Sequence, residues 1–247
     1  MDFDINGGRA NVQGARPYVI FATPSLSHSV SLEFFRSYLE TQAALDAAGI
    51  LHGCAQLGGC PFIDKARNQL VTDFLVSHPD ATDLFFIDDD LGWPAQAVVR
   101  MLARDEEIVA GMYPHKLGTV SFPGELDFAG EALTEANGLF RALHVPAGFM
   151  RIKRRALEAM ADRCGTYTDD HNGVLREHFR VFEMGVAADN KYTGEDYWFC
   201  RKWREGGGTI WVDPDIAFTH SGRHRFSGSL AATLRNWIES QAAKEAA

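Results

Sequence analysis

Three consecutive carboxylates, Asp88, Asp89 and Asp90, follow the apolar run at 84–87 (LFFI) directly. Adjacent carboxylates repel one another and resist leaving water unless a cation lies between them. A divalent metal is the simplest such cation. Carboxylate oxygens favour Mg²⁺ or Mn²⁺, which commonly bind one or two carboxylates together with the oxygens of a substrate diphosphate. The alternative is a solvated acidic turn before the helix that begins near Pro94, since acidic residues suit helix N-termini.

Two later segments carry further groups suited to such a site. Glu195 and Asp196 follow a glycine at the start of a predicted helix, and the aromatic residues around them can raise a carboxyl pKa or stack on a ring. His220 ends a predicted strand at 216–219. A lone histidine is more often structural than a ligand. The acidic triplet, the Glu-Asp pair and the histidine nevertheless form an ordered set.

The elements that must position these residues alternate between short apolar strands and amphipathic helices. Strands are predicted at 18–22, 50–56, 84–87 and 108–110, with helices over 29–48, around 66–74 and after Pro94. This β-α-β-α-β opening predicts an α/β fold with a mainly parallel central sheet and helices on both faces. Ligands bind beyond the carboxyl ends of the strands in such sheets, which is where the acidic triplet falls.

The second half of the chain is less regular. Strands are predicted at 139–145 and 149–153 around a tight turn at 146–148, and again at 209–212 and 216–219. Helices are predicted over 155–163, 195–205 and 229–244, whereas the polar stretch 165–190 is predicted to be a long loop or lid. We see no internal repeat and no linker, and therefore expect a single domain over 1–247.

The amino-acid composition limits which classes of function and partner are expected. The chain has 247 residues, and 24 basic against 33 acidic side chains give a net charge of −9, which disfavours general attraction to nucleic acid or anionic membranes. The sequence has no leader pattern at its start and no run of about 18 apolar residues. We expect a soluble, cytoplasmic protein without a membrane anchor, whose four cysteines are free thiols.

Several segments together resemble the GT-A-fold glycosyltransferases. FFIDDDLGW resembles their Asp-x-Asp motif, TGEDYWFCRKWREGGGTIWVDP their Glu-Asp helix and following strand, and AFTHSG their late metal-binding histidine. ATPS at 22–25 and KARN at 65–68 match nucleotide-facing loops found in family 2-like and Anp1-like members. The resemblance implies one GT-A-type, Rossmann-like domain with a small acceptor-side subregion. Its parts would be a nucleotide-binding half at 18–112, a donor and acceptor half at 113–222, and a C-terminal tail and helix at 223–247.

The resemblance also implies roles for the acidic triplet and the histidine. Asp88 would contact the nucleotide ribose or the metal, and Asp90 would ligate the metal, which would be Mn²⁺ or Mg²⁺. His220 would complete the protein ligands of that metal. Asp89 is an additional carboxylate at the variable middle position, and whether Asp88 or Asp89 binds the ribose is left open.

On the donor side, the resemblance places Pro24 and Ser25 against the base or ribose and Gly148 in a donor-side loop. Arg67 would reach the nucleotide or its diphosphate, the alternative being a surface charge on a helix. The segment 113–116 follows the fourth strand and is a candidate to shape the donor pocket, with loop exposure slightly favoured for Lys116.

The resulting hypothesis is a metal-dependent glycosyltransferase acting on a nucleotide-diphosphate sugar. Breaking the sugar–phosphate bond puts charge on the leaving diphosphate, which a metal and basic groups can stabilise. An inverting reaction needs a base for the acceptor hydroxyl, and Asp196 is the candidate, with Glu195 orienting it or binding acceptor hydroxyls. In a retaining reaction Asp196 would instead stabilise an oxocarbenium-like centre.

The partners are less constrained. Class frequency favours a UDP-sugar, with a GDP-sugar second. The acceptor could be a glycan, a small molecule or a hydroxylated base in DNA, for which basic residues at 153–155 and 201–204 could form a local surface. The competing hypothesis is a nucleotide-sugar-binding protein of the same fold without turnover, which would be expected to lack the Glu-Asp pair or the histidine.

Overall fold

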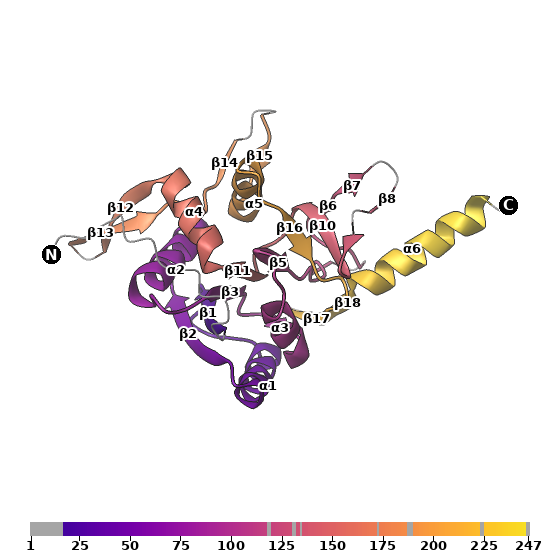
Figure 1. Ribbon diagram of the computed structural model, residues 1–247, viewed down its shortest axis with the longest axis horizontal. Coiled ribbons are helices and arrows are strands. Elements are labelled where there is room, and N and C mark those ends of the chain that lie inside the picture. The colour runs from indigo at the N-terminus through magenta and orange to yellow at the C-terminus, as the bar shows by residue number, and fades with distance from the viewer. Residues whose placement is uncertain are drawn as a thin grey trace.

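A nine-stranded sheet runs through the centre of the molecule, as the computed structural model shows (Figure 1). The structure describes residues 17–117, 120–129, 132–133, 135–171, 173–186, 190–222 and 225–245. Eight strands follow one another across the sheet, and β9 (Glu135–Ala136) pairs separately with β10. Their order is β2 (Leu51–Gly58), β1 (Tyr18–Ser25), β3 (Asp83–Ile87), β11 (Phe149–Lys153), β5 (Ile108–Ala110), β16 (Ile210–Val212), β10 (Leu139–His144) and β6 (Glu125–Leu126).

The strand directions bring distant segments to one edge of this sheet. β1 is parallel to β2 and β3, and β16 is parallel to β5. β11 is antiparallel to both β3 and β5, so β5 runs in the direction of β1 and β3. The carboxyl ends of β1, β2, β3 and β5 therefore share one edge with the start of β11, and we call this the site edge. The predicted α/β class with a central sheet is confirmed, and the sheet is mixed because β11 and β10 run antiparallel to their neighbours.

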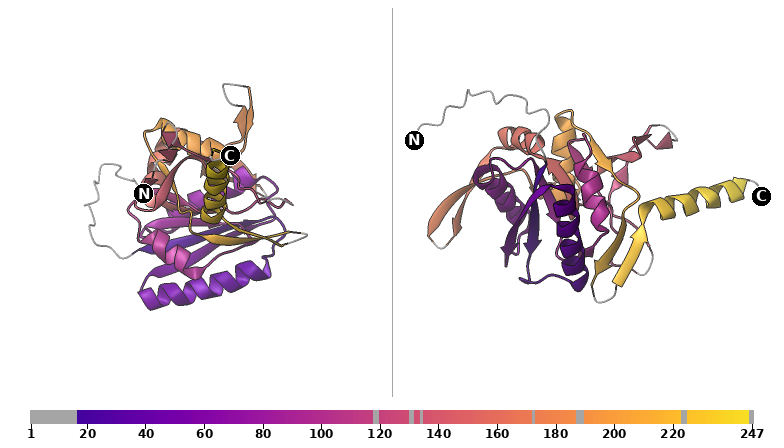
Figure 2. Two further views of the ribbon diagram at one scale, coloured as in Figure 1. Left: turned by 90° about the vertical axis from the view of Figure 1, so that its right-hand side faces the viewer. Right: turned by 60° about the horizontal axis from the view of Figure 1, so that its bottom comes forward.

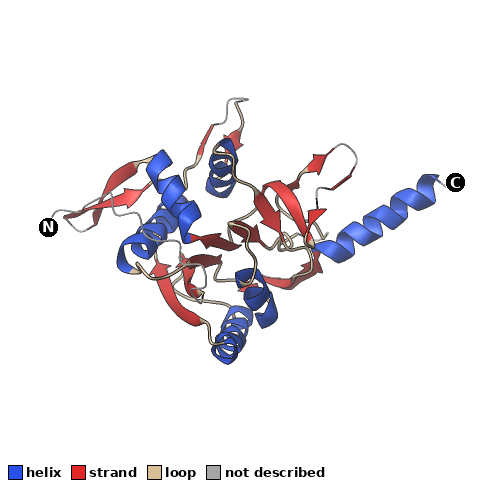
Figure 3. Ribbon diagram, in the orientation of Figure 1, coloured by secondary structure: helices blue, strands red, loops and turns tan. Residues whose placement is uncertain are grey.

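Helices cover both faces of the sheet, as predicted (Figures 1 and 3). Along β3, Leu84 and Phe86 face one core and Phe85 and Ile87 the other, following the alternation of a strand. The first core packs against α2 (Ile63–Ser77), α4 (Arg154–Cys164) and α5 (Glu195–Glu205). The second packs against α1 (Leu32–Ala48) and α3 (Ala95–Leu102). A strand buried on both faces explains the unbroken apolar run before the acidic triplet.

The bounds of α1 follow from its capping residues. The Ser31 side chain accepts a hydrogen bond from the Phe34 amide at 3.0 Å, which satisfies an end amide of the helix. Gly49 has a φ of 65° and its amide donates to the last-turn carbonyls of Leu45 and Asp46. The predicted stop at Gly49 is confirmed, whereas the helix begins at Leu32 rather than at residue 29 because Ser31 is the N-cap.

The prediction of a long loop or lid over 165–190 is wrong. β12 (Thr166–His171) and β13 (Val174–Phe179) form an antiparallel hairpin, and β14 (Gly185–Val186) pairs with β15 (Tyr192–Thr193). Polar contacts attach the hairpin to α2. Lys65 Nζ lies 2.8 Å from an Asp169 carboxylate oxygen, and the Phe179 amide donates to Thr72 Oγ1 at 3.0 Å. Phe179 also packs against the core, but the other anchoring contacts are polar, and the hairpin lacks the alternating apolar pattern that marks a strand.

Arginines hold the carboxyl ends of two helices. Arg151 is fully buried in β11 and donates to the carbonyls of Met101 and Arg104 at the end of α3, at 3.0 and 3.1 Å. Arg154 donates to the carbonyls of Phe74 and His78 at the end of α2. Helix ends leave such carbonyls without partners, and a cation there also interacts favourably with the helix dipole.

The C-terminal part of the chain lies beside the main sheet. β17 (Ala217–Ser221) is the middle strand between β18 (Arg225–Ser229) and β4 (Leu91–Gly92), and β7 (Phe128–Ala129) pairs with β8 (Ala132–Leu133). α6 (Leu230–Glu245) leaves the body and projects outward, as Figure 1 and the right-hand view of Figure 2 show. Within the described ranges, no helix is both long enough and apolar enough to span a membrane.

Candidate active site

The backbone of the acidic triplet is tied to three distant segments. The Asp88 amide donates to the Gly148 carbonyl at 2.9 Å. The carbonyls of Asp89 and Asp90 accept from the amides of Ser31 and Ser221, each at 2.8 Å. The triplet therefore lies at the site edge in a fixed arrangement, between the start of α1, the turn before β11 and the end of β17.

Asp90 and His220 face each other at this edge. Asp90 Oδ1 lies 3.3 Å from His220 Nε2, and the Asp90 carboxylate also contacts the Lys116 ammonium. The other ring nitrogen, His220 Nδ1, lies 2.7 Å from the Pro114 carbonyl. A carbonyl only accepts, so Nδ1 carries a proton, and Nε2 is the ring nitrogen that faces Asp90. Burial raises the pKa of Asp90, but His220 and Lys116 outweigh it and hold that pKa below its ordinary value.

This pair suits a divalent cation in its chemistry. Metal-bound histidines usually donate their second N–H to a carbonyl or carboxylate, as His220 does to Pro114. Asp88, the third predicted ligand, is turned toward Arg67 and Tyr113 instead. Across the residues that the structure describes, no group of three or more His, Cys, Asp or Glu side chains is placed to hold a metal ion. Two protein ligands fit a cation that takes its remaining ligands from water and substrate oxygens.

Arg67 joins Asp88 to the predicted Glu-Asp pair. Its side chain is 4% exposed, with Nη2 3.2 Å from Asp88 Oδ1 and Nε 3.2 Å from Glu195 Oε1. Burial lowers the pKa of Arg67, but the charges of Asp88 and Glu195 outweigh it and the net shift is upward. The Tyr113 hydroxyl donates to the second Asp88 oxygen at 3.3 Å. The structure thus places Arg67 behind the acidic triplet, within the protein.

Asp196 lies next to this network at the start of α5. Its Oδ1 accepts a hydrogen bond from the Tyr197 amide at 2.8 Å. Burial and the neighbouring Glu195 charge raise the pKa of Asp196 to about 6, although Arg67 opposes the shift. A carboxylate with such a pKa is ionised at neutral pH and is a stronger base than an ordinary aspartate.

Gly148 lies against Asp88 and Tyr113. A Cβ at this position would collide with the Asp88 carboxylate and the Tyr113 hydroxyl, both of which are side-chain atoms. Any larger residue at position 148 would therefore displace the side chains of Asp88 and Tyr113. This close contact requires glycine for space rather than for backbone conformation.

A small hollow of about 150 Å³ opens at the carboxyl ends of β1 and β2. Ser25, His28 and Gly58 contribute to its wall. Pro24 lies beside it in β1, paired in register with Leu57. The pKa of nearby Asp89 is raised above its ordinary value. Burial and the charges of Asp90 and Asp88 raise it, and they outweigh a contact with Ser25 that lowers it. Asp89 is therefore the member of the triplet that faces Ser25, next to Pro24 at the end of β1.

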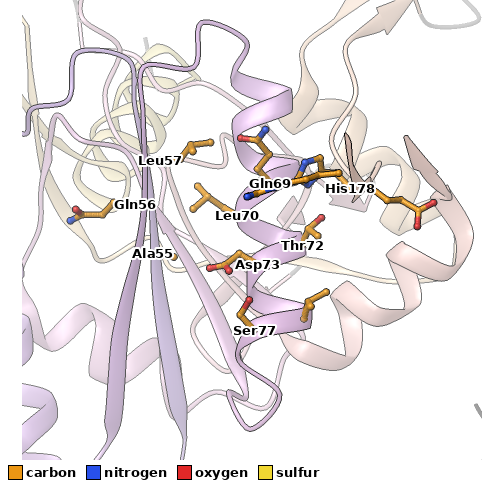
Figure 4. A pocket seen from close by; sticks show the side chains of 12 residues that line it. Ala55, Gln56, Leu57, Gln69, Leu70, Thr72, Asp73, Ser77 and His178 are labelled. Carbon is orange, nitrogen blue, oxygen red and sulfur yellow. The ribbon is translucent and has the colours of Figure 1, made fainter. Parts of the chain in front are cut away.

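A larger hollow of about 550 Å³ lies along α2, between β2 and β13 (Figure 4). Gln56 and Leu57 belong to the walls of both hollows. None of the predicted site residues lines the larger one, which includes Asp73 and His178. The predicted site residues are thus concentrated at the site edge and not in this larger hollow.

Two residues of the segment 113–116, the candidate to shape the donor pocket, lie at the site edge. Tyr113 contacts Asp88, and Lys116 contacts Asp90 although loop exposure was slightly favoured for it. Both residues follow β5, and a position just after a strand indicates a place near the carboxyl ends of the strands, where ligands bind. The basic segment at 153–155 is engaged within the fold: Lys153 Nζ donates to the Asp105 carbonyl at 2.9 Å and Arg155 pairs with Glu107 at 3.0 Å.

Comparison with known proteins supports the fold. No family model and no curated protein matches the chain. Among solved structures it is similar to A197 from STIV, with 18% identity, 87% of this chain and 91% of that chain covered, and a TM-score of 0.52. A glycosyltransferase involved in glycosylation of the major capsid of PBCV-1 matches at 8% identity over 58% of this chain and 63% of its own, with a TM-score of 0.33. The first likeness shows a shared fold, and the second is too low to carry an argument.

Proposed function

We propose that this protein is a metal-dependent glycosyltransferase that moves a sugar from a nucleotide-diphosphate sugar to a hydroxyl acceptor. The observation that carries the proposal is the convergence of Asp90 and His220 at one sheet edge, 3.3 Å apart. Asp196, with a pKa raised to about 6 by burial and Glu195, adjoins the same network. Cation-binding groups and a base are the two components that sugar transfer from a diphosphate requires.

The donor would bind along the site edge. Its nucleoside would enter the hollow walled by Ser25, beside Pro24, where Asp89 offers a carboxylate to the ribose hydroxyls. Asp90 and His220 would hold Mn²⁺ or Mg²⁺, which when bound supplies positive charge to the leaving diphosphate. The close approach of Gly148 to Asp88 leaves this part of the edge free of an additional side chain.

Asp196 is proposed as the base for the acceptor hydroxyl. Its raised pKa lets it take a proton at neutral pH, which favours a direct, inverting transfer. Glu195 Oε1 already accepts from Arg67, which supports an orienting role for Glu195 over acceptor binding. The presence of a base beside the network favours turnover over binding alone. A UDP-sugar is the preferred donor, with a GDP-sugar second, and the acceptor is a soluble glycan or small molecule.

Release of UDP or GDP from a panel of nucleotide sugars, with and without Mn²⁺, tests the proposal. Calorimetry should show UDP or GDP affinity that increases with Mn²⁺, and Asp90→Asn or His220→Ala should remove this increase. Asp105→Asn is the control, since Asp105 is fully exposed on the loop after α3. Metal-independent binding in all four proteins, or no release from any donor, would refute the proposal.

A further inference from the structure

We propose that Arg67 is a positioning residue that holds the donor-side Asp88 and the first turn of α5 in one fixed arrangement, so that Asp196 faces the donor sugar. The inference rests on the proposed function. It gives Arg67 a task different from the nucleotide contact that the sequence resemblance implies.

Arg67 bridges two carboxylates that come from different elements. Arg67 lies on α2, Asp88 follows β3, and Glu195 begins α5, so one side chain connects three elements. Its Nη2 and Nε atoms lie 3.2 Å from the Asp88 and Glu195 carboxylates, respectively. The guanidinium is planar and rigid, so two such contacts fix the separation of the two carboxylates. Asp196 directly follows Glu195 and is held by the same turn.

The Arg67 side chain is buried among aromatic rings. Arg67 is 4% exposed, and its guanidinium carbon lies 5.4 Å from the ring centre of Phe86 and 6.0 Å from that of Phe182. A group enclosed by aromatic rings and two carboxylates is directed into the protein. Its Nη1 atom is buried and has no hydrogen-bond partner among the described residues. If a substrate oxygen reached Nη1, Arg67→Lys would weaken the affinity for UDP or GDP.

Arg67 supplies the positive charge for a group of neighbouring carboxylates. The carboxylates of Asp88, Glu195 and Asp196 all act on Arg67, and the Glu195 side chain is only 10% exposed. Buried carboxylates that lose their cation separate or take up protons. Either response would move the first turn of α5. Lysine keeps the charge but lacks the planar fork, so Arg67→Lys separates the geometric contribution from the electrostatic one.

The test compares Arg67→Lys with Arg151→Lys, a second buried arginine whose partners are carbonyls at the end of α3. We expect Arg67→Lys to lower kcat for donor turnover about 10- to 100-fold, because small misplacements of reacting groups cost about that much. The affinity for UDP or GDP with Mn²⁺ should stay within about twofold. Arg151→Lys should leave kcat unchanged, with circular dichroism confirming that both variants are folded.

A double-mutant cycle tests whether Arg67 acts through Glu195. If it does, Arg67→Lys with Glu195→Gln should reduce kcat no further than the more damaging single variant. Additive losses, an unchanged kcat in Arg67→Lys, or a loss confined to nucleotide affinity would each overturn the positioning role.

A readout without turnover separates this inference from the proposed function. Hydrogen exchange at the amides of 195–198 should accelerate in Arg67→Lys and stay unchanged in Arg151→Lys. A wild-type protein that turns over no donor refutes the proposed function without any variant. Unchanged exchange in Arg67→Lys refutes the positioning role whether or not the protein is an enzyme.

Discussion

At Asp90 two side chains compete for one carboxylate. His220 Nε2 approaches one oxygen, and Lys116 contacts the other. A divalent cation bound by Asp90 and His220 would lie close to the Lys116 ammonium, and like charges repel. The same lysine that lowers the pKa of Asp90 therefore opposes the cation that we propose for this site.

Replacing Lys116 with methionine should tighten Mn²⁺ binding about two- to fivefold. Lys116 is 38% exposed, so solvent screens the pair and limits its contribution to about 1 kcal/mol. Calorimetric titration with MnCl₂ measures the change directly. Lys153→Met is the control because Lys153 pairs with Asp105, away from Asp90. Weaker Mn²⁺ binding in Lys116→Met would contradict the competition.

The raised pKa of Asp196 predicts the pH dependence of transfer. A base must be ionised, so kcat/KM should fall about tenfold per pH unit below pH 6 and level off above it. An ordinary aspartate would stay active to about pH 4. Asp196→Asn should lower the rate about 10²- to 10⁴-fold with little change in UDP affinity. A pH–rate profile whose acidic limb lies near pH 4 would argue against Asp196 as the base.

At the scale of elements, β11 contributes to both the site and the stability of the fold. It begins at the site edge beside Gly148 and carries Arg151 in its centre. Arg151 ties the sheet to the end of α3, and Arg154, just beyond the strand, ties it to the end of α2. Because α3 and α2 lie on opposite faces of the sheet, β11 is held from both faces.

Arg151→Met should lower the free energy of unfolding by about 3–5 kcal/mol, the usual cost of breaking a buried charge pair. Asp83, 3.6 Å from Arg151, would keep a buried carboxylate without its cation, and helix-end carbonyls would lose their donors. Arg155→Met, which alters a 63% exposed side chain, should change stability by no more than about 0.5 kcal/mol. Urea unfolding of both variants gives the comparison. A loss below about 1 kcal/mol for Arg151→Met would show that its contacts are dispensable.

Local patterns predicted many elements of this fold. The strands at 108–110 and 149–153 and the helix at 195–205 have the predicted bounds. The direction of β11 could not be predicted, because an apolar run reads the same in parallel and antiparallel strands. The hairpin at 166–179 was missed because polar pairs such as Lys65 and Asp169 anchor it.

The site could be predicted only in part for a similar reason. Motif order identified Asp90 and His220, which the fold brings together. The partners of Asp88 depend on how α2 and β5 meet β3, and no local pattern encodes the contacts with Arg67 and Tyr113. Lys116 reaches Asp90 only because β5 and β3, with β11 between them, end at the same edge of the sheet.

At the scale of the whole molecule, α6 extends away from the body that carries the site (Figure 2). Leu230 is 6% exposed at its start, whereas Trp237 and Ile238 are 55% and 56% exposed further along. The base of the helix thus belongs to the core, and its outer part adds little to folding stability.

Replacing both Trp237 and Ile238 with serine should change the free energy of unfolding by no more than about 0.5–1 kcal/mol, the range of exposed positions. Leu230→Ala, which leaves a cavity in the core, should cost about 2–5 kcal/mol. Chemical denaturation followed by circular dichroism measures both. A loss in the double variant as large as that of Leu230→Ala would place the outer helix in the folding unit.

The hydrogen bond from Ser221 to the Asp90 carbonyl has a consequence for how the protein is made. During translation the acidic triplet leaves the ribosome long before Ser221 does, and so do Ser31 and Gly148. Until β17 is synthesised, a nascent chain carries the carboxylates without the strand that brings His220 to them. Ribosome-bound chains stopped before this strand should therefore lack metal-assisted nucleotide capture, which would appear only late in synthesis.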